Sequence, residues 1–135
     1  MPATRHYFSN ALGSIDFVPG AYVQLRWSGQ PLSSPELRAL YIHVRNVLER
    51  KGLHCLLVDH RAMASAPDAA DQQWLLTQWL PETAARTRAT HYAALPAPDP
   101  ARRLHTEPVV QDLRRYLSVA LFDDPEQAAA WFDAA

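Results

Sequence analysis

Residues 53–67, which read LHCLLVDHRAMASAP, decide the fold of this chain. Residues 55–58 form an unbroken apolar run, which is typical of a strand buried on both faces of a parallel sheet. Asp59, His60 and Arg61 follow directly, at the point where that strand should emerge. Because ligands of open α/β sheets gather outside the carboxyl ends of the strands, a site is expected here first.

The N-terminal part has the pattern of strands joined by tight turns. Residues 5–8 and 14–18 are short strand segments, and Pro19 with Gly20 marks a turn. Residues 21–27 then alternate between apolar and polar side chains, which is the period of a strand with one face less buried than the other. We expect these segments to form an antiparallel hairpin at the edge of the sheet.

The strongest amphipathic helix lies between this hairpin and the central strand. Apolar residues recur at spacings of three and four over residues 37–48. Ser33 or Ser34 is placed to cap its start, and Glu36 is placed to complete a capping box. Gly52 ends the helix as a left-handed C-terminal cap.

The second half of the chain continues the alternation of helices and strands. Asp68 can cap a second helix that runs to about Leu80. Pro81 lacks an N–H group and should kink or end that helix. A polar connection over residues 82–88 then leads to a strand at residues 91–95.

One more strand and two more helices complete the prediction. Thr106 can cap a helix whose apolar stripe covers residues 109–117. Residues 118–122 form a short strand, and Asp123 or Asp124 caps the last helix.

The order β-β-α-β-α-β-α-β-α predicts an α/β fold. Strands that alternate with helices pair in parallel through right-handed crossovers. We therefore expect a mainly parallel sheet of about five strands, an antiparallel N-terminal edge hairpin and four helices. With 135 residues, of which 48% are apolar and 20% charged, the chain is expected to be one folded domain over residues 1–135.

Composition excludes several classes of function. The net charge of −1 argues against binding to nucleic acid or anionic membranes. No apolar run approaches the ~20 residues that span a bilayer, and the start of the chain lacks the apolar region of a signal peptide. Cys55 is the single cysteine, so an internal disulfide is excluded and a reducing, cytoplasmic location is expected.

Several short stretches match one family in their order and spacing: residues 25–29 (LRWSG), 57–61 (LVDHR), Trp74 with 79–81 (WLP), and 122–124 (FDD) with 130–132 (AWF). With these, the chain resembles the STAS fold of bacterial anti-anti-sigma factors. It resembles more closely the STAS-like proteins, small bacterial domains that mostly lack an assigned function. The likeness covers nearly the whole chain. It implies a four-turn β-α superhelix with helices mainly on one face of the sheet.

The chain departs from anti-anti-sigma factors at the start of the second helix. Those proteins carry an Asp-Ser-Ser-Gly type motif there, whose serine is phosphorylated by a kinase partner. Here residues 65–71 read SAPDAAD, so acidic residues occupy the matching turn and Ser65 lies a few residues early. Ser65 remains a candidate site residue.

Asp59, His60 and Arg61 allow more than one interpretation. Neighbours in a strand point to opposite faces, so Asp59 and Arg61 share a face while His60 points away from both. An ion pair between Asp59 and Arg61, a ligand site, and proton transfer by His60 are all compatible with the pattern.

The other candidate binding residues lie on the second helix. Asp68 stands at a helix N-terminus, which attracts anions, but Asp68 and Asp71 already supply negative charge there. Trp74 and Trp79 either line an apolar pocket or pack between helix and sheet.

Two further sets of residues suggest no site. The six histidines are scattered, and their spacing indicates no metal site. A basic cluster is best interpreted as a solvated face balanced by nearby acids; it comprises Arg102, Arg103, His105, Arg114 and Arg115.

These observations leave three functional hypotheses. The first is a non-enzymatic regulatory module that docks another protein through the second helix and the loop over residues 63–71. The second is a small-molecule or lipid binder whose pocket is lined by Trp74, Trp79 and Tyr92. The third, an enzyme that uses His60 as acid or base, has no further support in the sequence, and no cofactor is expected. The surplus of Trp and Tyr predicts a homodimer.

Overall fold

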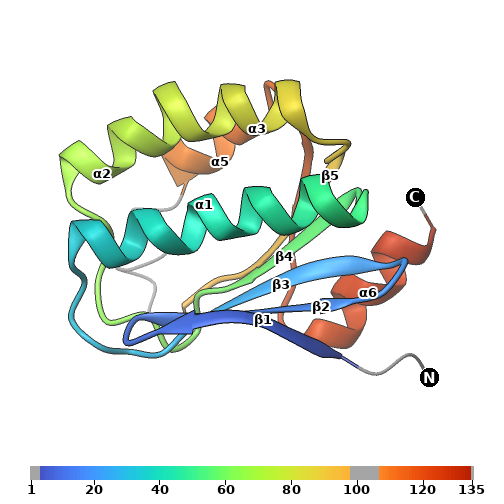
Figure 1. Cartoon of the computed structure of the whole chain (residues 1–135), viewed down its shortest axis with the longest axis horizontal. Coiled ribbons are helices and arrows are strands. Elements are labelled where there is room, and N and C mark those ends of the chain that lie inside the picture. The colour runs from blue at the N-terminus through green and yellow to red at the C-terminus, as the bar shows by residue number, and fades with distance from the viewer. Residues whose placement is uncertain (1–3, 98–106, 135) are drawn as a thin grey trace.

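The structure is a computed structural model of the chain, in which residues 4–97 and 107–134 are described. Six strands form one mixed sheet, and helices cover both of its faces (Figure 1). The strands are β1 (Arg5–Asn10), β2 (Gly13–Val18), β3 (Tyr22–Trp27), β4 (Cys55–Asp59), β5 (His91–Leu95) and β6 (Ser118–Leu121). The helices are α1 (Ser34–Lys51), α2 (Ala69–Trp74), η1 (Leu75–Trp79), α3 (Leu80–Arg86), α5 (Glu107–Leu113) and α6 (Pro125–Asp133).

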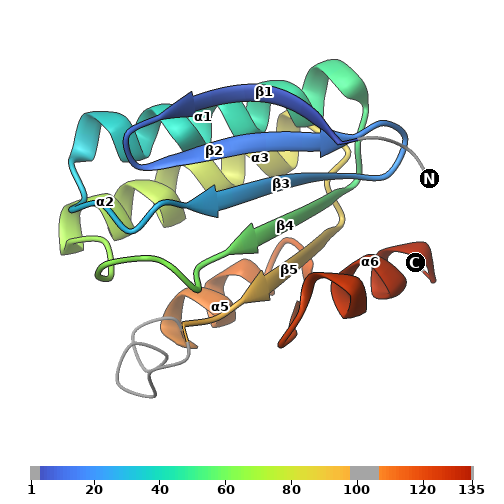
Figure 2. The same cartoon turned by 90° about the horizontal axis from the view of Figure 1, so that it is seen from below.

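The strands lie in the sheet in the order of the sequence, from β1 to β6. β1, β2 and β3 are antiparallel neighbours, whereas β3, β4, β5 and β6 are parallel to one another (Figure 2). The α/β class and the antiparallel N-terminal edge are therefore confirmed. The hairpin prediction was incomplete: the N-terminal part is a meander of three strands, and the sheet has six strands rather than about five. The strand segment at residues 5–8, which the sequence pattern left short, extends through Asn10 because it pairs with β2.

The helices divide unequally between the two faces of the sheet. α1, the continuous run of α2, η1 and α3, and α5 lie on one face, and α6 alone lies on the other (Figure 1). The larger core lies under the first group and includes Leu25, Leu40, Leu56 and Val58. A smaller core under α6 contains Leu57, Ala93 and Phe132. β4 is buried along its whole length because both of its faces are covered.

The second helix does not end at Pro81, so of the two predicted outcomes, a kink or an end, the end is wrong. Helical structure continues to Arg86, so most of the expected polar connection is helix α3. The helix accommodates Pro81 by changing its geometry in η1, a π-helical turn in which the Leu80 N–H donates to the Leu75 carbonyl. A wider turn just before a proline relieves the clash between its ring and the carbonyl four residues earlier, which is why the helix survives.

Three predicted helix ends are confirmed, but the predicted capping box at the start of α1 is wrong: Ser33 makes no capping hydrogen bond, and its hydroxyl donates to the Glu36 side chain at 3.0 Å. Gly52 adopts the left-handed conformation with φ 61° at the end of α1. Asp68 accepts a hydrogen bond from the Asp71 N–H at 2.8 Å, and Asp124 caps α6 through the Gln127 N–H at 2.9 Å. Thr106, the predicted cap of the third helix, lies outside the described residues.

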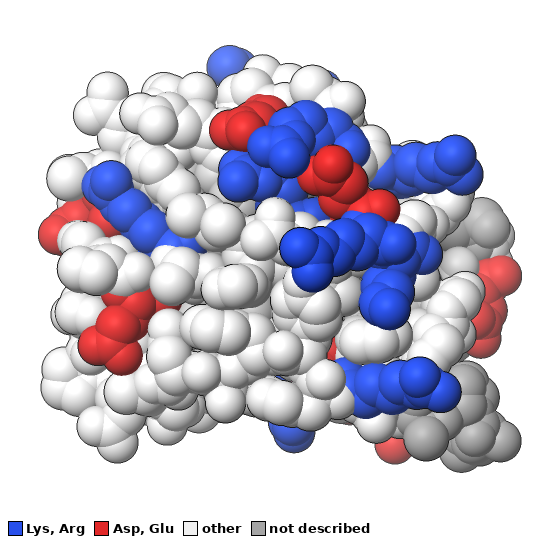
Figure 3. Space-filling view, in the orientation of Figure 1, with Lys and Arg blue, Asp and Glu red and all other residues white. Residues whose placement is uncertain are grey.

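Charged side chains of both signs are interleaved over the C-terminal part of α1 and over α3 (Figure 3). Arg45 pairs with Glu82, and Arg86 pairs with both Glu82 and Glu49. This network joins two neighbouring helices, so the side chains there balance one another rather than form a basic surface. Of the predicted basic cluster, Arg102, Arg103 and His105 lie outside the described residues.

Candidate functional site

The candidate site lies at the carboxyl ends of β4 and β5. β4 is an inner strand, parallel to β3 on one side and to β5 on the other. The His60 N–H extends the pairing by donating to the Leu95 carbonyl at 2.9 Å. The polar residues after β4 therefore emerge at the rim of the sheet, as the sequence predicted.

Asp59 and Arg61 form the predicted ion pair, although Arg61 lies in the turn after β4 rather than on the strand. The guanidinium donates to both carboxylate oxygens, at 3.0 and 2.9 Å, and the Arg61 N–H donates to Oδ1 at 3.0 Å. Burial alone would raise the pKa of Asp59, but the hydrogen bonds and charge of Arg61 outweigh it and hold the pKa below its ordinary value. This bidentate pair closes a tight turn, and its groups already satisfy one another.

His60 points away from that pair, toward the face of the sheet that carries α1, α2 and α5. Its Nε2 lies 3.5 Å from the Tyr92 hydroxyl, and its Nδ1 is buried without a partner among the described residues. Burial lowers the pKa of His60 to about 4, and the nearby negative charge of Asp59 offsets this only in part. The imidazole is therefore neutral at pH 7, and its hydrogen-bonding neighbour among the described residues is the Tyr92 hydroxyl rather than a carboxylate.

A cavity of about 80 Å³ lies beside His60, between the strand ends and the helices. Tyr92 and Ala94 on β5 form its floor, and Tyr41 on α1 adds a second phenol ring. Burial, with Tyr41 nearby, raises the pKa of Tyr92 well above its ordinary value. Apolar side chains from η1 and α5 complete the walls, among them Leu75, Val110 and Leu113. All described lining side chains are uncharged at neutral pH.

The rim of the cavity is more polar than its floor. Ser65 and Gln72 line it there, and Ser65 is exposed, so the cavity reaches the surface on this side. Gln72 is held in place because its amide donates to the Pro67 carbonyl at 2.7 Å. Of the predicted site residues, the fold thus brings His60 and Ser65 to one cavity.

Asp68, Trp74 and Trp79 have other positions in the structure. Asp68 caps α2 and does not line the cavity. Trp79 is buried at 3% exposure, and its indole N–H donates to the Tyr41 carbonyl at 2.6 Å. Trp74 is half-buried beneath the Arg38 guanidinium, 5.1 Å from the ring centre. The pocket expected between the second helix and the strand ends includes Tyr92, but neither tryptophan lines it.

Two features of the site were not identified from the sequence. Tyr41 was assigned only to the apolar stripe of α1, although its ring also borders the cavity. Asp71 is buried at 3% exposure and accepts hydrogen bonds from Ser34 at 2.7 Å and from Arg38 at 3.1 Å. Asp71 therefore ties the start of α2 to the start of α1. The sequence places Asp71 three residues after Asp68, which indicates the helix cap that Asp68 forms with the Asp71 N–H. Nothing in that spacing indicates the contacts of the Asp71 side chain with Ser34 and Arg38.

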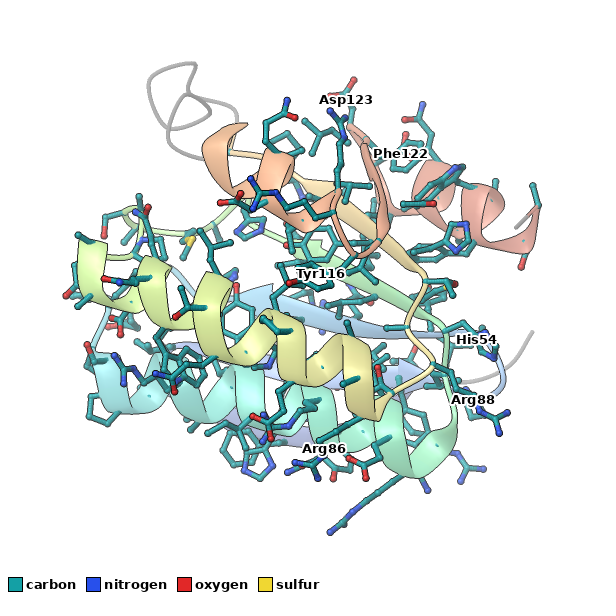
Figure 4. The ribbon with its side chains drawn as sticks, turned by 90° about the horizontal axis from the view of Figure 1, so that it is seen from above. His54, Arg86, Arg88, Tyr116, Phe122 and Asp123 are labelled. Atoms are coloured by element: carbon teal, nitrogen blue, oxygen red, sulfur yellow. The ribbon has the colours of Figure 1, made fainter. Side chains whose placement is uncertain are left out.

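A second hollow lies on the outside of the molecule, between the α2–η1 helix and α5. Leu76 and Leu80 line it on one side, and Asp112, Arg115 and Tyr116 line it on the other. Figure 4 shows Tyr116 lying between α5 and the long helix. Tyr116 is 47% exposed, so this groove presents an aromatic ring to solvent.

These features define an α/β domain with an uncharged cavity at the ends of parallel strands. Over residues 4–97 and 107–134, no cluster of three or more His, Cys, Asp or Glu side chains is arranged to hold a metal ion. None of the described helices combines the length and apolar character needed to cross a membrane. Comparisons of the chain with protein-family models, curated proteins and solved structures gave no match.

Proposed function

We propose that this chain is a non-enzymatic binding module of STAS-like fold that takes a small uncharged molecule into the cavity beside His60. The observation that carries the proposal is the lining of the cavity. Tyr41, His60 and Tyr92 supply polar groups within walls that are otherwise apolar. A few placed polar groups in an apolar cavity at the strand ends are typical of small-molecule sites in α/β proteins.

The lining also defines the kind of ligand. A charged molecule would lose its hydration without gaining an opposite charge, because the described lining offers none. A volume of about 80 Å³ is smaller than the ~150 Å³ cavity known to hold benzene. The ligand is therefore a molecule of a few heavy atoms, such as a short alcohol, an amide or a ketone, rather than a lipid.

Uncharged and charged analogues of equal size test this directly. We expect acetamide and propanol to perturb the NMR signals of Tyr92 and Ala94, and acetate and ethylammonium to leave them unchanged. Ala94→Val adds methyl groups to the floor of the cavity and should abolish the perturbation. Ala93→Val is the matched control, because the neighbouring residue faces α6 on the opposite side of the sheet. Equal responses to neutral and charged probes, or binding that survives Ala94→Val, would reject the site.

The assignment to the STAS-like proteins rests on the resemblance and on the arrangement of the βα units. Each of β4, β5 and β6 follows a helical segment on the same face of the sheet, which is compatible with a β-α superhelix. A modification switch at Ser65 is not part of the proposal, because Ser65 lies in the loop before the cap of α2 rather than in the helix.

Protein docking is the second candidate function, and the outer groove with Tyr116 favours it. The groove joins the second helix, where docking was expected, to α5. A photo-crosslinking residue at Tyr116, introduced in the cells that make the protein, should give one discrete adduct. The same residue at exposed Ala85 on α3 serves as the control position. Equal adducts at both positions, or none at Tyr116, would count against docking in the groove.

A further inference from the structure

The two outer edges of the sheet are built differently. β1 carries the charged residue Arg5, and its pairing with β2 is irregular between His6 and Phe8. Bulges and charged side chains are devices that protect an edge strand from pairing with another chain. β6, at the opposite edge, has the sequence SVAL, which contains neither a charge nor a proline, and its pairing with β5 is regular. The β6 edge therefore lacks the protection that the β1 edge has.

The backbone of β6 offers hydrogen-bonding groups to that open edge. The Ser118 N–H donates to the Thr90 carbonyl at 2.8 Å, and the Phe122 N–H donates to the Ala94 carbonyl at 3.0 Å. In a strand, each residue directs both its N–H and its C=O group to one neighbouring strand, and the next residue directs both to the other side. Val119 and Leu121 consequently direct theirs outward, where no described strand pairs with them.

An exposed apolar side chain lies on the same strand. Among the described residues, the large hydrophobic side chains that remain exposed are Tyr116 and Leu121, each at 47%. Leu121 is the last residue of β6, whereas Tyr116 lies in the turn before the strand and lines the groove beside α5. Phe122 and Asp123, which follow the strand, lie at the margin of the molecule in Figure 4.

We propose that β6 pairs in antiparallel fashion with β6 of a second copy of this chain, which joins the two sheets across a two-fold axis. The outward groups fix the register. Val119 exchanges two hydrogen bonds with Leu121 of the partner subunit, and the symmetric pair exchanges two more. Ala120 then faces the partner subunit's Ala120 on the axis, where strands approach most closely and a small side chain fits. This inference rests on β6 and the residues that flank it, and not on the cavity.

Side-chain chemistry supports the same register. Val119 and Leu121 share the helix-bearing face of the sheet, so each Leu121 is covered by the partner's Val119. Arg114 and Arg115 precede the strand, whereas Asp124 and Glu126 follow it. An antiparallel pair therefore brings the basic end of one copy to the acidic end of the other, which favours association with a second copy.

Sedimentation velocity over micromolar to submillimolar concentrations tests the pairing. We expect the native chain to approach twice the 15.2 kDa of the monomer. Leu121→Pro removes an outward N–H from each copy and should raise the dissociation constant at least about tenfold. Leu121→Val keeps that N–H and an apolar side chain, so it should remain dimeric. Circular dichroism confirms that each variant is folded.

A charge exchange makes the test independent of substitutions in the strand. Arg114→Glu should weaken the dimer by about three- to tenfold at low salt, and adding Glu126→Arg should restore it. A native chain that sediments as a monomer throughout the range would overturn the proposal. A dimer that is unchanged by Leu121→Pro, or a double variant no tighter than Arg114→Glu, would show that association uses another surface or register and would also overturn it.

Discussion

The buried imidazole of His60 makes the stability of the protein depend on pH in a defined direction. Its pKa lies at about 4 in the folded chain, against 6.5 for an ordinary histidine. Above pH 6.5 the imidazole is neutral in both the folded and unfolded states, and its contribution to stability is complete. As the pH falls from 6.5 to about 4, the unfolded chain binds a proton that the folded chain does not, so stability is lost.

The size of this loss follows from the difference between the two pKa values. Each pKa unit corresponds to about 1.4 kcal/mol, so His60 should account for a loss of about 3 kcal/mol in the free energy of unfolding between pH 7 and pH 4. Asp59 acts mainly below this range. Its folded pKa is lowered, so its contribution is present above the ordinary value of 3.8 and is lost as the pH falls through the folded pKa.

Urea denaturation at a series of pH values, followed by circular dichroism, measures the effect. His60→Gln removes the titrating group, so its stability should fall by about 3 kcal/mol less than that of the native chain across the same range. His54→Gln is the matched control, because His54 is exposed and lies at the opposite end of the sheet, near Arg88 (Figure 4). If His60→Gln and the native chain lose stability in parallel, the imidazole is not buried in a neutral form and the reasoning fails.

Three further substitutions test parts of the fold by the same denaturation assay. Gly52→Ala meets no atom within 4 Å but must adopt φ 61°, so it should cost about 1 kcal/mol through backbone strain; an unchanged stability would contradict the left-handed cap. Asp71→Ala removes the acceptor for Arg38 and unties α2 from α1, with an expected cost of about 2–3 kcal/mol, and a cost below about 0.5 kcal/mol would argue against the buried contact. Trp79→Phe removes the indole N–H that donates to the Tyr41 carbonyl and should cost about 1–2 kcal/mol through the lost hydrogen bond and packing, whereas a neutral result would show that this contact does not stabilise the fold.

Local chemistry was enough to determine much of this protein from its sequence. The apolar run at residues 55–58 gave an inner parallel strand, because only a strand covered on both faces can bury every side chain. Gly52, Asp68 and Asp124 marked helix ends, since a left-handed residue or a side-chain acceptor acts on groups within three residues of itself. The ion pair between Asp59 and Arg61 was also expected, although it joins the end of β4 to the turn that follows rather than two residues of one strand face.

Contacts between distant segments decided the rest. Local rules predict a kink or an end at Pro81, but a π-helical turn together with packing against the core keeps the helix continuous. The cavity combines Tyr41 and Tyr92, which lie far apart in the sequence, and excludes the two tryptophans that composition made prominent. Helix periodicity reports that a residue faces inward, but it cannot report which residue of another element it meets there. Contacts between residues of different elements are decided only when the helices pack on the sheet. The candidate site is made of such contacts.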